Sequence, residues 1–358
     1  MASRSNSSMR IFLLFCFFTQ CIYNAIVRAQ QVPCYFIFGD SLADPGNNNN
    51  LITQAKANYQ PYGVDFSAGP TGRFTNNRTL PDVIGQLLGF PEFIPPFANT
   101  AGKNITKGVN YASAVSGIRD ETGKNQGDRV SLNKQLLNHL TTYFKIRQIL
   151  GSGTATSQHF GKCIYVIITG NNDYINNYFM PNMYLTSRLY TPQQYADVLA
   201  AQYTAQLKVL YSLGARKVAV FGVGLIGSAP QMITRFGANS TNVSLTAQLF
   251  SNKLPGIVNN LNSLLPGAKF TFINVTGITI TSPPAPGLNT TGTCCQLVQN
   301  LGTCVPGSTP CPNRSLYAFF DGFHPSDVVN AAFGQRAYTK QLATDASPYS
   351  IQQLSQLP

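Results

Sequence analysis

The chain has 358 residues, of which 44% are hydrophobic, and it carries a formal net charge of +12 at pH 7. This length and composition suffice for a buried core and fit one large α/β domain. The lysines and arginines are scattered singly and form no run, which argues against a nucleic-acid-binding groove. The basic charge has two open interpretations: adhesion of an exported protein to acidic polysaccharide such as a cell wall, or solubility alone.

Residues 1–29 have the composition of a secretory signal peptide. Two arginines and no acid precede an apolar run over residues 11–27, and Val27-Arg28-Ala29 resembles a small-residue cleavage site. Gln20 and Asn24 interrupt the run, so it is a poor candidate for a permanent membrane anchor. We therefore expect export, and a single mature domain over residues 30–358.

Loss of this segment would remove three arginines and lower the formal charge from +12 to +9. It would leave an even number of cysteines, which in an exported chain is consistent with up to three disulfides of undetermined pairing. These cysteines are Cys34, Cys163, Cys294, Cys295, Cys304 and Cys311. A zinc site is the weaker alternative, because no Cys-x-x-Cys pair with a matching histidine pair occurs. The sequence implies no metal and no cofactor.

Asn-x-Ser/Thr sequons also fit the secretory route. They predict glycosylation at Asn77, Asn104, Asn239, Asn242, Asn274, Asn289 and Asn313.

The first expected element is a buried parallel strand over residues 34–38, followed by the turn-forming residues 39–46. Ser41 then lies just past the carboxyl end of a strand, which is where open α/β sheets bind ligands. On composition alone, a turn serine or a helix N-cap is the simpler interpretation. The long segment 44–107 is rich in Asn, Gly, Pro and aromatic residues, and we expect it to cover a site with loops and short helices.

The segments that follow alternate between apolar runs and helical periodicity. Further strands are expected at residues 109–112, 163–169, 217–221 and 269–275. Helices are expected at residues 131–150, 191–213 and 244–265, with a final helix at 326–340. Pro255 should bend or break the third of these helices. In the first of these helices the face expected to point inward carries Leu132, Leu136, Leu137, Leu140, Phe144 and Ile149, and Gly151 ends it. The alternation predicts a mainly parallel sheet with helices on both faces. The cysteine-rich segment 276–320 is expected to be a cross-linked loop region.

A serine hydroxyl becomes a nucleophile when a base lies within hydrogen-bond reach and a third group orients that base. The chain has three histidines. His139, among polar neighbours in a helical pattern, and His159, in a polar loop, are expected to be solvated. His324 follows Asp321 by three residues, a spacing that lets the carboxylate accept a hydrogen bond from the ring, although a surface ion pair would look the same.

Hydrogen-bond donors for a developing oxyanion are also available after three of the expected strands. They are the backbone N–H of Ser41, a backbone N–H within residues 113–117 and the side-chain amide of Asn172. In a doubly wound sheet these strand ends converge on one crevice. Each of these residues alone is equally compatible with an ordinary turn former.

The chain resembles the plant GDSL esterase/lipase family, a branch of the SGNH hydrolases. The resemblance rests on FGDSL at 38–42, GVNYAS at 108–113, GNND at 170–173 and DGFHP at 321–325, together with CC at 294–295 and PCPNR at 310–314. It implies a flavodoxin-like three-layer α/β/α sandwich with a mainly parallel five-stranded sheet.

The same resemblance implies roles for individual residues. Ser41 would be the nucleophile, His324 the base, Asp321 the residue that orients it, and Asn172 an oxyanion donor. Asp40 and Asp173 match family positions, and we expect them to stabilise turns.

One departure concerns the oxyanion hole. Many members carry Gly-Gly after the NYAS sequence, whereas this chain has Ala114 and Val115. Their backbone N–H groups survive the change, but a conformation that only glycine adopts easily would not. We therefore expect a donor from Ala114, Val115 or Gly117, with a hole formed slightly differently.

These features predict a secreted serine esterase/lipase that hydrolyses small-molecule or lipid esters through an acyl-enzyme. One alternative is an acyltransferase that uses the same intermediate with an alcohol acceptor. The other is a non-catalytic wall-binding or defence protein on the same fold.

Overall fold

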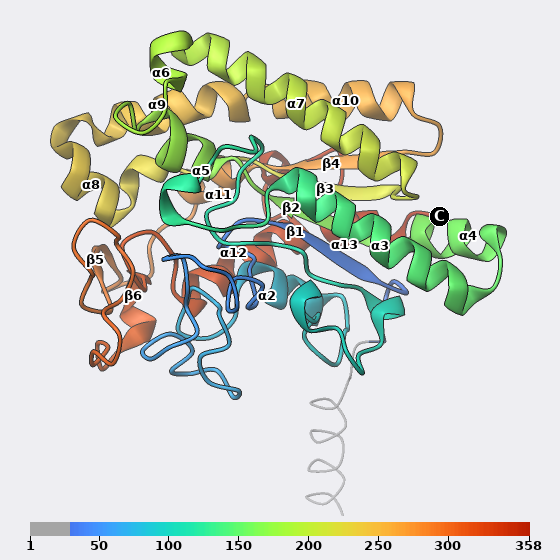
Figure 1. Ribbon diagram of the computed structural model, residues 1–358, viewed down its shortest axis with the longest axis horizontal. Helices are drawn as coiled ribbons and strands as arrows, with labels where there is room; N and C mark the ends of the chain where they lie inside the picture. The colour runs from blue at the N-terminus through green and yellow to red at the C-terminus, as the bar shows by residue number, and fades with distance from the viewer. Residues whose placement is uncertain (1–28) are drawn as a thin grey trace, which may run out of the picture.

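The computed structural model describes residues 29–358, so the predicted signal peptide lies, apart from its last residue, outside the described residues. The main sheet has the strand order β1-β2-β3-β4-β7. Its strands are β1 (Tyr35–Gly39), β2 (Ile164–Ile168), β3 (Lys217–Phe221), β4 (Lys269–Ile273) and β7 (Ala346–Ser347). The first four are parallel and β7 is antiparallel to β4. The sheet lies between two layers of helices (Figure 1).

The helices cover both faces of the sheet. They are α2 (Leu80–Leu87), α3 (Leu132–Leu150), α4 (Gly153–Lys162), α5 (Asn171–Asp173), α6 (Thr186–Leu189), α7 (Pro192–Ser212), α8 (Pro230–Phe236), α9 (Ser240–Ser251), α10 (Leu254–Leu264), α11 (Val275–Thr281), α12 (Asp327–Thr339) and α13 (Ile351–Gln356). Within the described part of the chain, no helix is long and apolar enough to cross a membrane.

Alternation along the strands produces two separate cores. Phe36 and Phe38 of β1 point to a cluster with α3, α4, α7, α9 and α10, whereas Tyr35 and Ile37 point to one with α2, α11, α12 and α13. Because parallel strands are buried on both faces, they read as continuous apolar runs, and this made them predictable. The three-layer α/β/α architecture is confirmed.

Helix boundaries follow the predicted signals. Thr191 caps α7 in a capping box with Gln194, and Pro192 occupies the first turn. Gly151 ends α3 in a left-handed conformation with φ 74°. The expected break at Pro255 separates α9 from α10.

The prediction of a strand at residues 109–112 is wrong. This segment runs beside β1 and makes only isolated bridges, from Asn110 to Ile37 and to Pro96. The Asn110 side chain donates to Ala43 O at 2.8 Å and accepts from Ala112 N–H at 2.9 Å, so it competes with a regular ladder. The fifth strand of the main sheet is instead β7, which the sequence did not predict.

The predicted inward face of α3 is also partly wrong, because Leu137, Phe144 and Ile149 are exposed. The buried face carries Gln135 and His139 instead. Gln135 Oε1 accepts the N–H of Gly39 at 2.9 Å, and its Nε2 donates to Gly39 O at 2.8 Å. This polar contact fixes the rotation of α3. The helix expected at 326–340 corresponds to α12 but is not the last, since α13 follows it.

The cysteine-rich region forms a small unit beside the sheet, with β5 (Asn289–Thr293) paired to β6 (Tyr317–Phe319). The disulfides are Cys34–Cys163, Cys294–Cys311 and Cys295–Cys304. The first joins the starts of β1 and β2, and the other two hold the loop that leads to Asp321 and His324.

Candidate active site

Ser41 lies in a tight turn directly after β1. Gly39 has φ 146°, and a Cβ there would lie 2.2 Å from Ile168 O of β2, so only glycine fits. The Asp40 carboxylate then accepts the N–H of Leu42 at 3.0 Å, and its carbonyl accepts those of Ala43 and Asp44. These bonds close the turn and place Ser41, which is 9% exposed, at the sheet's carboxyl edge.

The turn between β6 and α12 brings Asp321 and His324 to the same place. His324 Nε2 lies 2.7 Å from Ser41 Oγ, and His324 Nδ1 lies 2.8 Å from Asp321 Oδ2. Asp321 Oδ1 accepts the backbone N–H groups of Phe323 and His324, both at 2.8 Å. The ring of Phe74 packs against the imidazole with centroids 4.8 Å apart. The hydroxyl, imidazole and carboxylate therefore form one continuous chain of hydrogen bonds.

Candidate oxyanion donors surround the same point. Among the described residues, neither the N–H of Ser41 nor that of Val115 has a hydrogen-bond partner, whereas the N–H of Ala114 donates to Asp44 Oδ2 at 2.9 Å. Asn172 Nδ2 donates to Ser116 O at 3.1 Å and so has a second proton available. Ser41, Ala114, Val115 and Asn172 line one cavity with His324, and Gly117 does not.

This cavity has a volume of about 620 Å³ and continues beyond the serine over α8, α11 and α12. Its wall is mainly apolar and includes Ile175, Leu225, Leu288, Phe319, Phe323 and Phe333. A cavity of this size and character can take an extended hydrocarbon group.

A family model described as GDSL-like lipase/acylhydrolase matches residues 35–337. The chain belongs to this family. It is 49% identical over 335 residues to GDSL esterase/lipase At5g45670 of Arabidopsis thaliana, covering 91% of this chain and 92% of that protein. It is 46% identical over 349 residues to GDSL esterase/lipase At1g29670 of the same plant, covering 94% and 96%. The resemblance seen in the sequence is thereby confirmed, and the family is one of carboxylic ester hydrolases.

Val115 occupies the second of the two positions at which many GDSL family members carry glycine. It adopts φ 57°, a left-handed conformation that is unfavourable for a β-branched residue. The backbone thus keeps the shape that glycine would allow, and the substitution is accommodated as local strain.

Three buried aspartates support the turns of this GDSL site. Burial raises the pKa of Asp40, Asp44 and Asp173 to about 6 each, while hydrogen bonds from backbone N–H groups act in the opposite direction. Asp173 accepts from the N–H groups of Ile118 and Arg119 at 2.8 and 3.0 Å. These contacts agree with the turn-stabilising roles expected for Asp40 and Asp173.

The two other histidines were predicted to be solvated, and for His139 this is wrong. It is fully buried, its ring lies 5.0 to 5.7 Å from five aromatic rings, and burial lowers its pKa to about 3. Its polar neighbours Asn138 and Thr141 lie on other faces of α3, where they are half-buried and exposed. His159 is half-buried on α4 rather than in a loop, with Nε2 3.0 Å from Thr106 O. Neither histidine contacts Ser41.

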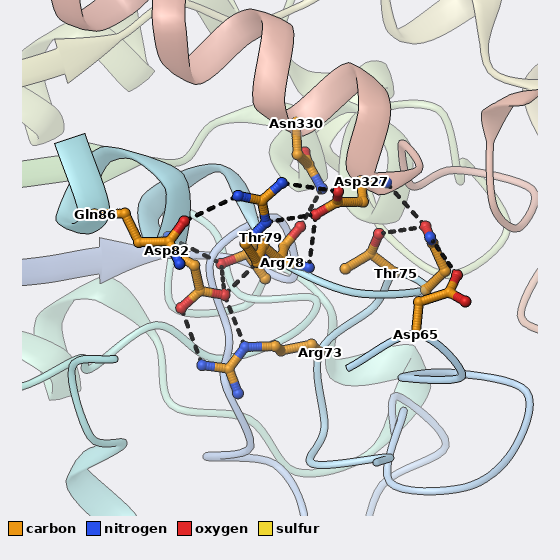
Figure 2. A network of polar contacts seen from close by, with 10 residues as sticks. Asp65, Arg73, Thr75, Arg78, Thr79, Asp82, Gln86, Asp327 and Asn330 are labelled. Atoms are coloured by element: carbon orange, nitrogen blue, oxygen red, sulfur yellow. Dashed lines mark hydrogen bonds and ion pairs between the residues drawn. The ribbon is translucent and has the colours of Figure 1, made fainter. Parts of the chain in front are cut away.

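A polar network that sequence reasoning missed fastens the start of α12, directly after His324. Figure 2 shows Arg78 between Gln86 of α2 and Asp327 of α12. The side chain of Asn330 donates to Arg78 O. The same loop is supported by a buried ion pair, in which Arg73 Nε lies 2.7 Å from Asp82 Oδ2. The partners are far apart in sequence, so no local pattern reveals them.

The predicted glycosylation sites do not line the cavity. Asn77 and Asn274 are half-buried, and the other five asparagines are exposed. The Asn274 side chain caps α11 by accepting the N–H of Gly277 at 2.9 Å. The side chains of Asn104, Asn289 and Asn313 also accept local hydrogen bonds.

Proposed function

We propose that the protein is a secreted serine esterase/lipase in which Ser41 is the nucleophile, His324 the general base and Asp321 the residue that orients His324. The observation that carries this proposal is the 2.7 Å contact between Ser41 Oγ and His324 Nε2, with Asp321 on the other ring nitrogen. Such an arrangement can activate a hydroxyl. Within the described part of the chain, no other serine has a hydrogen bond to a histidine. It favours an enzyme over a non-catalytic wall-binding protein.

The reaction has two stages. His324 takes the hydroxyl proton of Ser41 as Ser41 Oγ attacks the ester carbonyl carbon. The electrons of the carbonyl π bond move onto the carbonyl oxygen, which becomes the oxyanion. The tetrahedral intermediate collapses, the alcohol leaves with the proton from His324, and an acyl-enzyme remains. Water, activated by His324 in the same way, then releases the carboxylic acid.

Three donors are suited to the oxyanion. The backbone N–H groups of Ser41 and Val115 are without partners among the described residues, and Asn172 has a spare amide proton. Loss of one such donor costs about 3 kcal/mol of transition-state stabilisation. Ala114 acts differently: its N–H is held by Asp44, so it positions Val115 rather than contacting the oxyanion.

The apolar wall supports a lipid or other hydrophobic ester as the substrate. Four apolar side chains line the cavity that contains His324: Leu288, Phe319, Phe323 and Phe333. Removal of an acyl chain from water into this cavity contributes about 0.8 kcal/mol per methylene group.

Export is supported by the composition of residues 1–29, by the sequons and by three disulfides, which persist in oxidising compartments. The charge of the mature chain suits adhesion to acidic wall polysaccharide. Release of the protein from such polysaccharide by salt would test this part of the proposal.

The main test is turnover of p-nitrophenyl esters of increasing acyl length by the protein, by Ser41→Ala and by Ser212→Ala. Ser212 is an exposed serine at the end of α7 and serves as the matched control. We expect Ser41→Ala to lose at least about a thousandfold in kcat and Ser212→Ala to match the wild type. Equal rates for Ser41→Ala and wild type would remove Ser41 from the mechanism. Addition of an alcohol and separation of the products distinguishes hydrolysis from acyl transfer.

A further inference from the structure

Tyr62 contacts Asp321 from a segment far away in sequence. The tyrosine is fully buried, and its hydroxyl donates to Asp321 Oδ2 at 2.5 Å. The same hydroxyl accepts the backbone N–H of Cys304 at 3.1 Å. The phenol thus stands between the carboxylate that faces His324 and the loop closed by the Cys295–Cys304 disulfide.

We propose that Tyr62 is a positioning residue for catalysis, and that it makes the Cys295–Cys304 loop part of the support of Asp321. The proposal rests on the roles given above to Ser41, His324 and Asp321. Tyr62 itself does not line the cavity, so it acts on the substrate only through Asp321.

The buried carboxylate of Asp321 needs hydrogen-bond donors on both of its oxygens. Asp321 is 0% exposed, so every hydrogen bond to it comes from the protein. Its Oδ1 receives the backbone N–H groups of Phe323 and His324 in addition to lying near the ring. Among residues 29–358, its Oδ2 receives only Tyr62 and the His324 ring. Without the phenol, one carboxylate oxygen would have the imidazole as its sole donor.

The donors to Asp321 also set its orientation. The backbone bonds fix Oδ1 and the phenol fixes Oδ2, so together they set the rotation of the carboxylate plane. This rotation decides whether an oxygen faces His324 Nδ1 and holds the ring with Nε2 toward Ser41. A charge-assisted hydrogen bond of this length provides directional support.

Tyr62 is itself held firmly. Its ring packs against Tyr59, Phe74 and Phe320 with centroid separations of 5.4, 5.7 and 5.7 Å. Burial, and secondly the charge of Asp321, raise the pKa of Tyr62 well above its usual value, so the phenol remains a donor throughout the working range. The N–H of Cys304 orients the hydroxyl lone pairs and leaves its proton for Asp321.

The chain offers a matched control in Tyr59. Its hydroxyl donates to Cys304 O at 2.9 Å, so it anchors the same loop without contacting Asp321. A purely structural role of the loop would be disturbed by Tyr59→Phe as well as by Tyr62→Phe. A role through Asp321 would be disturbed by Tyr62→Phe alone.

The experiment measures kcat, KM and the pH dependence of kcat/KM for wild type, Tyr62→Phe and Tyr59→Phe, with thermal unfolding of each. We expect Tyr62→Phe to lower kcat roughly tenfold or more with KM within about twofold. The acid limb of its profile should move to higher pH, because a carboxylate that has lost the phenol donor draws more strongly on the remaining hydrogen bond from the His324 ring. Asp40, the other carboxyl near His324, is unchanged in both variants and does not contribute to the difference.

Tyr59→Phe keeps the ring that packs on Tyr62 and leaves the Cys304 N–H on the Tyr62 hydroxyl, so it should keep wild-type kinetics. The proposal is overturned if Tyr62→Phe has wild-type kcat and acid limb, even with a lowered Tm, or if both variants lose activity alike. An inactive wild type, or an active Ser41→Ala, would instead contradict the proposed function.

Should Tyr62→Phe not fold, 3-fluorotyrosine at position 62 keeps the size of the side chain and makes its hydroxyl a stronger hydrogen-bond donor. The acid limb must then move to lower pH, and no movement contradicts the proposal.

Discussion

The backbone N–H of Ala114 donates to the carboxylate of Asp44 at 2.9 Å, and this bond ties the segment that carries Val115 to the turn that carries Ser41. The other oxygen of Asp44 accepts the N–H groups of Gly46 and Asn47, both at 2.7 Å. Asp44 is fully buried, so it serves the loops rather than the substrate. It occupies the N–H of Ala114, whereas the N–H of Val115 has no partner among the described residues.

Replacement of Asp44 by Asn should therefore damage the oxyanion hole. An amide has one acceptor oxygen and cannot satisfy the donors on both sides, so one buried N–H is left without a partner. We expect a loss of about 1–3 kcal/mol in the free energy of unfolding and a fall of roughly ten- to a hundredfold in kcat. Urea unfolding and ester turnover measure the two effects. Asp128→Asn is the control, because this acid is exposed, lies outside the site and has no side-chain hydrogen bond or ion pair among the described residues. It should change stability by less than about 0.5 kcal/mol. Equal behaviour of the two variants would disprove the role of Asp44.

Val115→Gly should be tolerated, which is unusual for loss of a valine side chain. Glycine adopts the observed φ of 57° without strain, and this relief of about 1–2 kcal/mol offsets the greater entropy of glycine in the unfolded chain. We expect stability within about 1 kcal/mol of wild type and activity retained or increased. Val166→Gly, in the centre of β2, is the comparison and should cost at least about 3 kcal/mol. A loss for Val115→Gly as large as that for Val166→Gly would show that the side chain, not the backbone, matters.

His139 should make the protein less stable as the pH falls. Its folded pKa of about 3 lies below the unfolded value of about 6.5. The unfolded chain therefore binds the proton first, and stability present above pH 6.5 is lost progressively toward pH 3. His139→Phe removes this titration and keeps an aromatic ring in the cluster. The free energy of unfolding is measured with urea for both proteins at pH 7.5 and at pH 5. The variant-minus-wild-type difference should rise by about 2 kcal/mol from pH 7.5 to pH 5. A difference that does not change with pH would contradict the buried neutral imidazole.

The disulfides should separate stability from activity. Replacement of both Cys34 and Cys163 by serine opens a link across 129 residues and should lower the free energy of unfolding by about 4 kcal/mol. We expect kcat to stay unchanged, because this disulfide lies at the end of the sheet opposite Ser41. Replacement of Cys295 and Cys304 should cost less, about 2–3 kcal/mol, but should lower kcat because Cys304 holds Tyr62. Thermal unfolding and ester turnover of the two double variants provide the comparison. The reverse pattern would refute this assignment.

The central fold was predictable because its signals are local. The buried strand Ile164–Ile168 is a continuous apolar run, and α7 begins at a threonine and a proline that specify its first turn. β7 has two residues, too few for any periodicity, and so it was missed. The face of α3 was misjudged because the bond of Gln135 to Gly39 outweighs the pattern of leucines, and that bond spans 96 residues.

The candidate site likewise contains some contacts that the sequence reveals and others that it does not. Asp321 and His324 are three residues apart, so their pairing is visible in the sequence, and the family resemblance supplied the link to Ser41. Tyr62 lies 259 residues from Asp321, and Asp44 lies 70 residues from Ala114. No spacing rule connects such partners, because the fold alone brings them together.

The account depends most on Ser41 being the nucleophile that His324 activates, and a serine-directed fluorophosphonate tests this directly. Intact-mass measurement should show one adduct per chain, and peptide mapping should place it on Ser41. Ser41→Ala should take up none, and His324→Gln should react at least about a thousandfold more slowly. An adduct on a different residue, or undiminished labelling of Ser41→Ala, would contradict the account.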